Sequence, residues 1–288
     1  MTVSPSVVKE LREKTGAGMM DCKKALAEAK GDIEAAIEVL RKKGISTAAK
    51  KAGRTAADGL IGSYISDDLK LAVLVEVNCE TDFVTKTEDF QNFVNRVTEV
   101  VRDANPSHLD ELMAASFDNS TVKEAQTELV AKIGENLGVR RFARVVAECE
   151  GKIATYIHAG SKIGVIVVFD DQSGKLDNAT AREIAMHVAA MSPRYLRRDD
   201  VPESVIEKEK EIMMAQMSDL NKPPEIMEKI VSGKIGKVFT EICLEDQLYV
   251  RDPEGKATVC TWLGNIDKNI KIKSFKRLQV GEGVEKKS

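Results

Sequence analysis

The first part of the chain contains three short stretches in which apolar residues recur every three or four positions, the spacing of amphipathic helices. The third stretch places four of them on one face: Ile33, Ala36, Ile37 and Leu40. Glycines punctuate the stretches, with Gly16-Ala17-Gly18 after the first and Gly44 after the third, and Asp32 stands where it can cap the third helix. The pattern therefore predicts a small three-helix module over residues 5–44.

After a basic segment at residues 48–54 the apolar period changes from that of helices to that of strands. Two apolar runs, at 60–65 and 71–77, flank Asp67-Asp68 and predict a strand hairpin with its turn at these aspartates. An amphipathic helix follows, and its apolar face comprises Phe90, Phe93, Val94, Val97 and Val101. This part of the chain predicts a hairpin backed by a helix.

The hairpin pattern returns 92 residues later without a gap. Seven residues match in order, namely Gly59, Ile61, Tyr64, Ile65, Lys70, Val73 and Val75 with Gly151, Ile153, Tyr156, Ile157, Lys162, Val165 and Val167. A second helical face follows at 181–188, and a helix at 122–137 and a strand at 141–149 join the two copies. The sequence therefore predicts an internal duplication.

Beyond Pro202 two helical segments, 203–220 and 224–235, each carry one narrow apolar seam. The linking residues Asn221–Pro224 contain two prolines, which end one helix and can start the next. We expect an antiparallel helical hairpin, followed by a return to strand-like alternation at Ile270, Ile272 and Leu278.

Together these patterns indicate an α+β protein: a three-helix module, a duplicated core of strand hairpins backed by helices, and an inserted helical hairpin. The predicted units are the module at 1–54, the first core half at 55–148, the second core half at 149–200 with 236–288, and the helical hairpin at 201–235.

Composition narrows the class of protein. The 288 residues are 43% hydrophobic and 31% charged, as in globular proteins of about two domains. The net charge of −3 offers no long-range attraction to nucleic acid or to an anionic membrane, so we expect neither as a direct partner. No apolar run approaches the ~20 residues of a membrane span, and charged residues occupy the beginning of the chain, so we expect a cytoplasmic location. Five scattered cysteines fit a reducing compartment.

The sequence contains no pattern for a cofactor or a metal. Gly174-Lys175 and Gly233-Lys234 are each followed by an apolar residue, not by the Ser or Thr of a phosphate-binding loop. The three histidines, His108, His158 and His187, are spaced too widely for a local metal motif. We therefore expect no cofactor, no metal and no nucleotide hydrolysis by the chain itself.

The segment Asn78–Val84 has the most unusual local pattern, because it places Phe83 beside Asp82 between a strand and a helix. One interpretation is a helix cap in which Thr81 or Asp82 caps and Phe83 folds back onto the core. The other is an aromatic side chain offered to a partner. The second copy has no Asp-Phe pair at the equivalent place, 169–174, which favours a partner over a folding role.

Six motifs in this order carry a resemblance to a known family: Leu11–Leu26, Val77–Val84, Lys132–Asn136, His158–Gly160, Ala185–Ala190 and Val280–Lys286. They closely resemble the translation elongation factor Ts family over nearly the whole chain. The resemblance implies guanine-nucleotide exchange on elongation factor Tu, bound in its GDP and nucleotide-free forms. It implies an exchange factor that acts by binding, and not an enzyme with bond chemistry of its own.

The resemblance also implies a role for particular residues. The N-terminal module is similar to ubiquitin-associated folds and would dock on the GTPase through Lys9, Arg12, Met19, Met20 and Lys23. The core would insert its Thr81-Asp82-Phe83-Val84 segment near the nucleotide, with Ile133, Gly134 and His158 beside it and Val250 touching the partner's other domains. The helical hairpin implies possible homodimerisation through 203–235, as in some members.

Two departures and two alternatives accompany this assignment. Arg251 stands where the family segment often carries methionine, and the chain stops at Ser288, so we expect a C-terminal helical contact to be absent. One alternative is an adaptor that binds RNA or a ubiquitin-like protein through the module and the basic residues Lys50, Lys51 and Arg54. The other is an enzyme with Cys79 as nucleophile, although a small buried thiol is the interpretation that its apolar strand favours.

Overall fold

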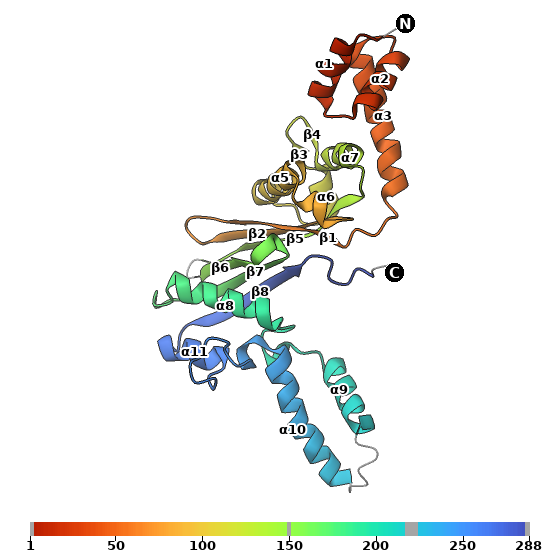
Figure 1. Ribbon diagram of the computed structural model, residues 1–288. Helices are drawn as coiled ribbons and strands as arrows, with labels where there is room; N and C mark the ends of the chain where they lie inside the picture. The colour runs from red at the N-terminus through yellow and green to blue at the C-terminus, as the bar shows by residue number, and fades with distance from the viewer. Residues whose placement is uncertain (1–2, 149–150, 217–223, 286–288) are drawn as a thin grey trace.

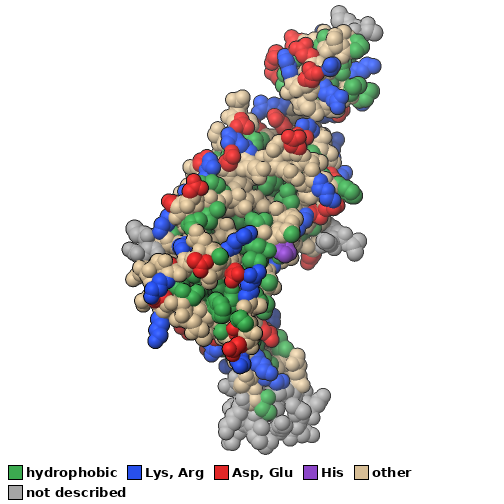
Figure 2. Space-filling view, turned by 60° about the vertical axis from the view of Figure 1, so that its left-hand side comes forward, with side chains coloured by type: hydrophobic (Ala, Val, Ile, Leu, Met, Phe, Trp, Pro, Cys, Tyr) green, Lys and Arg blue, Asp and Glu red, His purple; other side chains and the backbone are tan. Residues whose placement is uncertain are grey.

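The computed structural model describes residues 3–148, 151–216 and 224–285. The molecule is elongated, with the three-helix module at one end, two stacked sheets in the middle and the helical hairpin at the other end (Figure 1). The space-filling view shows the module as a lobe set off from the body (Figure 2). Among the described residues, no helix is long and apolar enough to cross a membrane.

The N-terminal module consists of α1 (Pro5–Thr15), α2 (Met19–Glu28) and α3 (Ile33–Lys51). Gly16 ends α1 in the left-handed conformation with φ +65°, and Asp32 caps α3 by accepting the Ala35 N–H at 2.9 Å. The module has its own small core, composed of Val8, Leu11, Cys22, Ala25, Leu26 and Ala36. The three predicted helices are therefore confirmed.

The predicted end of the third helix at Gly44 is wrong, because α3 continues to Lys51 and includes most of the expected basic linker. Gly44 is buried where α3 crosses α7 (Val122–Ile133), and a Cβ at Gly44 would lie 3.4 Å from that of Ala131. A glycine inside a helix costs only about 1 kcal/mol relative to alanine. Close packing of the two helices outweighs that cost, so the glycine marks a contact and not a stop.

The first core half has the antiparallel strand order β1 (Asp58–Ile65), β2 (Leu71–Cys79) and β5 (Leu137–Val146). Helices α5 (Glu88–Ala104) and α7 cover one face of this sheet (Figure 1). The short elements α4 (Asp82–Thr85), α6 (Leu109–Ala114), β3 (Ser116–Phe117) and β4 (Ser120–Thr121) complete the half. The hairpin predicted from residues 60–77 is confirmed, with Ile65 paired to Ala72 across the turn.

The connection between the two copies differs from the prediction. The helix expected over 122–137 ends at Ile133, because Gly134 adopts the left-handed conformation with φ +85°. The strand expected at 141–149 begins at Leu137, four residues earlier, and pairs along the whole of β2. The segment is therefore the third strand of the first sheet, and not merely a link.

The second core half repeats this arrangement with β6 (Gly151–Ile157), β7 (Ile163–Asp170) and β8 (Lys271–Gln279), covered by α8 (Asn178–Met191) and α11 (Val259–Ile266). Each central strand has one register shift against its third strand, at Glu76/Val77 in β2 and at Val168/Phe169 in β7. These positions are 92 residues apart, the same offset as the sequence repeat. The predicted duplication is confirmed and extends to the third strand.

The two sheets pack face to face, so the core is a four-layer stack of helices, sheet, sheet and helices (Figure 1). The residues between the sheets include Ile61, Leu74, Ile153, Ile166 and Leu278. Gly164 lies at the closest approach, where a Cβ would be 2.6 Å from Ile61 Cγ2. The stack fixes the ends of β2 and β6 relative to one another, and residues of the candidate site follow these two ends.

The helical hairpin comprises α9 (Glu203–Gln216) and α10 (Pro224–Ile242), with the short helices η2 (Arg198–Asp200) and η4 (Leu244–Asp246) at its base. Helix α10 runs to Ile242 and not to the predicted 235, because Ile235 and Phe239 continue the apolar contact with Ile206 and Met213. The predicted turn at Asn221–Pro223 and the seam residue Met217 lie outside the described residues.

Candidate partner-binding site

The Thr-Asp-Phe-Val segment forms the single turn α4 directly after β2. Its two central side chains point in different directions: Val84 is 5% exposed and belongs to the first core cluster, whereas Phe83 is 75% exposed. Lys86 Nζ lies 2.9 Å from Asp82 Oδ2 and 5.5 Å from the centroid of the Phe83 ring. The interpretation of Phe83 as a side chain folded back onto the core is therefore wrong.

The burial of Val84 gives this residue a structural role beside its predicted partner contact. Its side chain is 5% exposed and packs inside the first half, so it anchors the turn, and its remaining surface lines a groove beside Phe83. Thr85 is buried beside it and its hydroxyl donates to the Asp82 carbonyl at 2.6 Å. Buried residues on one side of α4 thus hold Asp82 and Phe83 at the surface on the other.

The Lys132–Asn136 motif lies next to this turn. The Glu135 carboxylate accepts the Thr81 N–H at 3.0 Å and the Thr81 hydroxyl at 2.8 Å. Ile133 and Gly134, at the end of α7, are partly exposed, and Ile133 contacts the first core cluster. The structure thus brings the predicted residues Ile133 and Gly134 close to Thr81 although they lie some fifty residues apart in sequence.

A groove of about 430 Å³ runs between the helical module and the first core half. Residues on both sides line it, among them Arg12 and Gly16–Gly18 of the module and Phe83 and Ile133 of the core. The Lys132 side chain crosses it, packing against Gly16 and pairing with Asp89 at 2.7 Å. Arg12, predicted to dock on the partner, and Phe83, predicted to insert into it, therefore line the same groove.

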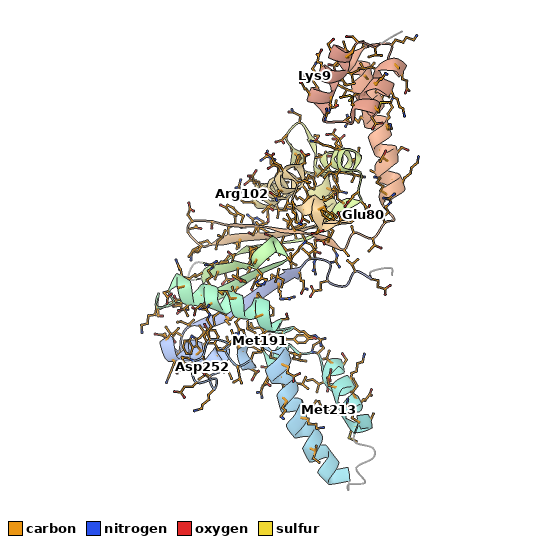
Figure 3. All side chains as sticks on the ribbon, in the orientation of Figure 1. Lys9, Glu80, Arg102, Met191, Met213 and Asp252 are labelled. Atoms are coloured by element: carbon orange, nitrogen blue, oxygen red, sulfur yellow. The ribbon has the colours of Figure 1, made fainter. Side chains whose placement is uncertain are left out.

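The other predicted docking residues are exposed on the module but do not line this groove. Met19 and Met20, at the start of α2, are 59% and 62% exposed. Lys9 and Lys23 are exposed on α1 and α2, and Lys9 lies away from the sheets (Figure 3). Two large apolar side chains exposed side by side are a feature of binding surfaces.

His158 belongs to the second core half and lies near the same edge of the stacked sheets. It is exposed after β6, and its ring Nδ1 lies 3.1 Å from the Tyr156 hydroxyl. The following Lys162 bonds to Asp58 and to the Gly59 carbonyl at the start of β1. Gly59 pairs with Asn78, three residues before Thr81, so the duplicated sheets bring His158 and the Phe83 turn to one edge.

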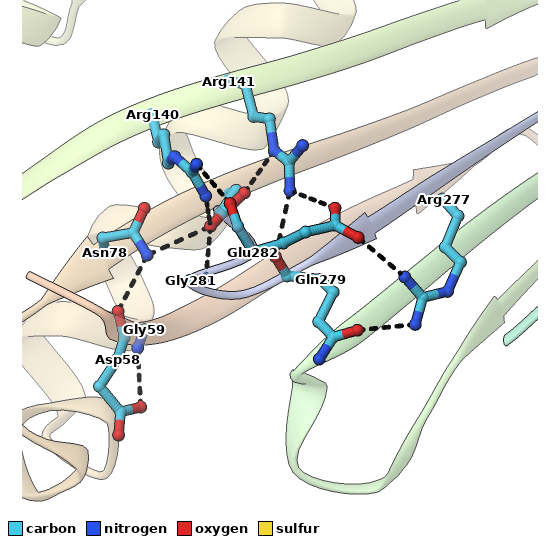
Figure 4. A network of polar contacts seen from close by, with 10 residues as sticks. Asp58, Gly59, Asn78, Arg140, Arg141, Arg277, Gln279, Gly281 and Glu282 are labelled. Atoms are coloured by element: carbon cyan, nitrogen blue, oxygen red, sulfur yellow. Dashed lines mark hydrogen bonds and ion pairs between the residues drawn. The ribbon is translucent and has the colours of Figure 1, made fainter. Parts of the chain in front are cut away.

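A buried carboxylate ties this edge to the C-terminal segment. Glu76 is fully buried in β2 and receives Arg140 at 3.0 Å, Arg141 at 2.5 Å and the Gly281 N–H at 2.9 Å (Figure 4). Gly281 has φ +72°, and a Cβ there would lie 2.3 Å from the Ala57 carbonyl oxygen, so only glycine fits. Glu282 extends the network to Arg141 and Arg277.

Two opposing effects act on the pKa of Glu76. Burial raises it, but the hydrogen bonds from Arg141, the Gly281 N–H and Arg140 together lower it below the usual value for glutamate. Sequence reasoning did not single out Glu76. The available signal was a lone carboxylate inside the apolar strand Leu71–Val77, since such a residue is rarely buried unless paired.

Comparison with known proteins identifies the family. The family model described as Elongation factor TS matches residues 80–282. The chain belongs to the elongation factor Ts family. It is 47% identical to Elongation factor Ts of Halothermothrix orenii, over 99% of this chain and 95% of that protein. It is 48% identical to those of Thioalkalivibrio sulfidiphilus and Syntrophotalea carbinolica, over 100% of this chain and 95% and 96% of theirs. Elongation factor Ts promotes nucleotide exchange on elongation factor Tu during translation elongation.

Val250, another predicted contact with elongation factor Tu, also lies away from the Phe83 turn. It is 50% exposed, and its N–H donates to Nδ1 of the buried His187 at 3.3 Å. Figure 3 shows Met191 and Asp252 on the opposite side of the stacked sheets from the module, near the base of the hairpin. Arg251, which stands where the family often carries methionine, pairs with Glu183 at 2.6 Å.

The residues that suggested other functions have structural roles in this chain. Cys79 is buried, and burial raises the pKa of its thiol to about 12, which leaves no thiolate for nucleophilic chemistry near neutral pH. In the basic segment, Lys51 donates to the Gly134 carbonyl and Arg54 lies 3.5 Å from Glu80. Within the described residues no cluster of three or more His, Cys, Asp or Glu side chains forms a metal site.

Proposed function

We propose that this chain binds elongation factor Tu in its GDP-bound and nucleotide-free forms and releases GDP by inserting the Asp82–Phe83 turn near the nucleotide. The observation that carries the proposal is the 75% exposure of Phe83 on a turn whose other side is buried. A factor that binds the nucleotide-free partner more tightly than the GDP complex lowers the affinity for GDP by the same factor. Insertion alone is sufficient, so the action requires no bond chemistry, and we place it in the cytoplasm.

The energy required is modest. A thousandfold lower affinity for GDP corresponds to about 4 kcal/mol of binding free energy, because each ~1.4 kcal/mol changes the affinity tenfold. Burying one phenylalanine side chain in a partner contributes about 1.5–3 kcal/mol. Asp82, Ile133, Gly134 and His158 are proposed to supply the remainder through contacts that displace the nucleotide's own ligands.

The direct test is the release of fluorescent GDP from elongation factor Tu as the concentration of this chain is raised. We expect a rate that rises and then saturates, and an excess of unlabelled GDP makes each release event irreversible. Binding to elongation factor Tu without faster release would contradict the proposal and would favour the adaptor interpretation.

A double substitution tests the docking role of the module. Met19→Ala with Met20→Ala is expected to raise the concentration giving half-maximal exchange by about tenfold or more, since two exposed side chains each lose buried area in the complex. The maximal rate should stay within twofold. Val146→Ala is the matched control, because Val146 is 58% exposed at the opposite end of β5. An unchanged half-maximal concentration would contradict docking through these methionines.

We also propose that the helical hairpin mediates homodimerisation. Its inner face packs Met213 and Ile230 against Ile235, but Ile212 and Met214 remain 42% and 44% exposed on α9. Ile212→Glu is expected to convert a concentration-dependent dimer into a monomer in light scattering. A wild-type chain that stays monomeric at the highest concentration would remove the hypothesis, and a dimer that survives Ile212→Glu would place the interface elsewhere.

A further inference from the structure

Two carboxylates cross-link the end of β2 to the end of α7. Glu135 accepts both the N–H and the hydroxyl of Thr81, at 3.0 Å and 2.8 Å, and Glu80 Oε1 accepts the Asn136 N–H at 2.5 Å. Each segment therefore supplies one carboxylate, and each carboxylate accepts hydrogen bonds from the other segment. Hydrogen bonds to an ionised acceptor are about twice as strong as neutral ones. We call the four residues Glu80, Thr81, Glu135 and Asn136 the carboxylate clamp.

The clamp replaces the ordinary means of holding the turn. A threonine before a helix commonly accepts an N–H of the first turn, but the Thr81 hydroxyl donates to Glu135 and makes no capping bond to α4. Helix α4 has only four residues, too few for stability by its own hydrogen bonds. Its orientation thus depends on the buried Val84 and Thr85 on one side and on the clamp at Thr81, the residue before the helix.

Two clamp residues, Glu80 and Asn136, and the neighbouring Gly134 also contact the end of the helical module. Lys51, the last residue of α3, donates to the Gly134 carbonyl, and Asn136 Nδ2 donates to the Arg54 carbonyl at 2.7 Å. Arg54 Nη1 lies 3.5 Å from Glu80 Oε1. Figure 3 shows Glu80 on the side of the first core half that faces the end of α3. The clamp therefore joins three parts of the chain: the module, α7 and the Phe83 turn.

We propose that Glu135 is a positioning residue that acts through Thr81 to fix the direction of Asp82 and Phe83, and that the Glu80–Asn136 half of the clamp links this direction to the docked module. The inference rests on the proposed exchange function. Glu135 is not free to bind a partner directly, because both of its carboxylate oxygens accept hydrogen bonds from Thr81 and the residue is only partly exposed. Its effect on a partner is thus indirect.

A purely structural role predicts a different outcome from a positioning role. If the clamp only stabilised the fold, its loss would lower the melting temperature and would reduce exchange in proportion to the unfolded fraction. If it positions Phe83, its loss lets the turn sample other directions while the fold persists. The maximal exchange rate then falls, and the concentration for half-maximal exchange, which depends on module docking, changes little.

The decisive variants are Glu135→Gln and Thr81→Val in the full chain. Glu135→Gln keeps the shape, removes the charge and leaves one oxygen to accept the two Thr81 donors, and we expect the maximal rate to fall about tenfold with the half-maximal concentration within twofold. Thr81→Val removes the hydroxyl donor and keeps the N–H, and should give a similar loss. The loss in the double variant should be less than the sum of the two, because both substitutions act on the same pair of residues. Thr81→Ser, which keeps the hydroxyl and the N–H, should recover the rate that Thr81→Val loses. Glu128→Gln, at an exposed position of α7, is the control.

A second readout does not depend on the partner. Phe83→Trp combined with Trp262→Phe leaves the chain's single tryptophan on the turn. We expect Glu135→Gln to lower the steady-state fluorescence anisotropy at this position, with an unchanged melting temperature. If the wild-type chain failed to speed GDP release while this anisotropy still fell, the proposed function would be wrong and the clamp would stand.

Three results would overturn the clamp proposal. One is an unchanged anisotropy and an unchanged maximal rate in Glu135→Gln. Another is a raised half-maximal concentration with the maximal rate preserved, which would make Glu135 a docking residue. The third is a loss of exchange that follows the melting temperature across Glu135→Gln, Thr81→Val and Thr81→Ser, which would leave the clamp a structural element only.

Discussion

Phe83→Ala is expected to lower the maximal rate of GDP release from elongation factor Tu by about ten- to a hundredfold, with the melting temperature changed by about 2 °C or less. The exchange effect follows from losing roughly 1.5–3 kcal/mol of burial in the partner. The small effect on folding follows from the 75% exposure of the ring, since exposed surface substitutions usually lie within about 0.5 kcal/mol of wild type. GDP-release kinetics and thermal unfolding should be measured on one preparation.

Two control variants separate insertion from folding. Phe90→Ala, seven residues later, removes a fully buried ring of the first core cluster and should cost about 3–5 kcal/mol of folding free energy. Val146→Ala removes apolar surface of comparable exposure at the far end of the sheet and should change neither quantity. If Phe83→Ala unfolded as readily as Phe90→Ala, the ring would belong to the core in solution and the insertion mechanism would fail.

Glu76→Ala is expected to lower the melting temperature by roughly 6–12 °C, from a loss of about 3 kcal/mol. The substitution leaves Arg140 and Arg141 without their shared acceptor and removes the partner of the Gly281 N–H. Because these groups join the first half to the C-terminal segment, thermal unfolding followed by circular dichroism should show the effect directly. Glu282→Ala is the matched control, since Glu282 is exposed and its loss should cost about 1 kcal/mol or less.

The contribution of Glu76 should also depend on pH with a definite sign. Its pKa in the folded protein is lower than in the unfolded chain, so its stabilisation is present above the usual glutamate pKa, about 4.3. That stabilisation is lost as the pH falls through the lowered pKa of the folded state. The difference in unfolding free energy between wild type and Glu76→Ala should therefore narrow in acid. A difference that widened below pH 4 would contradict the assignment.

The two copies differ in how the loop after the central strand is held, and only the first copy carries the proposed inserting turn. After β7, at the place equivalent to the Phe83 turn, Asp171 is 7% exposed and accepts the N–H groups of Lys175 and Leu176 at 3.2 Å and 3.0 Å. The loop of the second copy is thus held by hydrogen bonds between a side chain and backbone groups of the same loop. The loop of the first copy is instead held from behind by Glu135, which leaves Phe83 at the surface.

The sequence by itself determined the elements whose signals are local. The apolar period distinguishes the helices of the module from the hairpin strands, and Asp32 marks the start of α3 through a hydrogen bond to Ala35, three residues away. The repeat at an offset of 92 residues established the duplicated core. The absence of an Asp-Phe pair from the second copy favoured a role for Phe83 outside the fold, and its exposure agrees with that.

Only the tertiary structure decided the features that join distant segments. Gly44 continues a helix because α7 packs against it, whereas Gly134 ends one, although both are glycines in apolar helical patterns. The sequence separation between partners is 54 residues for Thr81 with Glu135 and 205 for Glu76 with Gly281. A local pattern reports the hydrogen bonds and burial that a residue shares with its near neighbours. The direction of Phe83 and the charge state of Glu76 depend instead on groups that meet only when the two sheets and the module have packed.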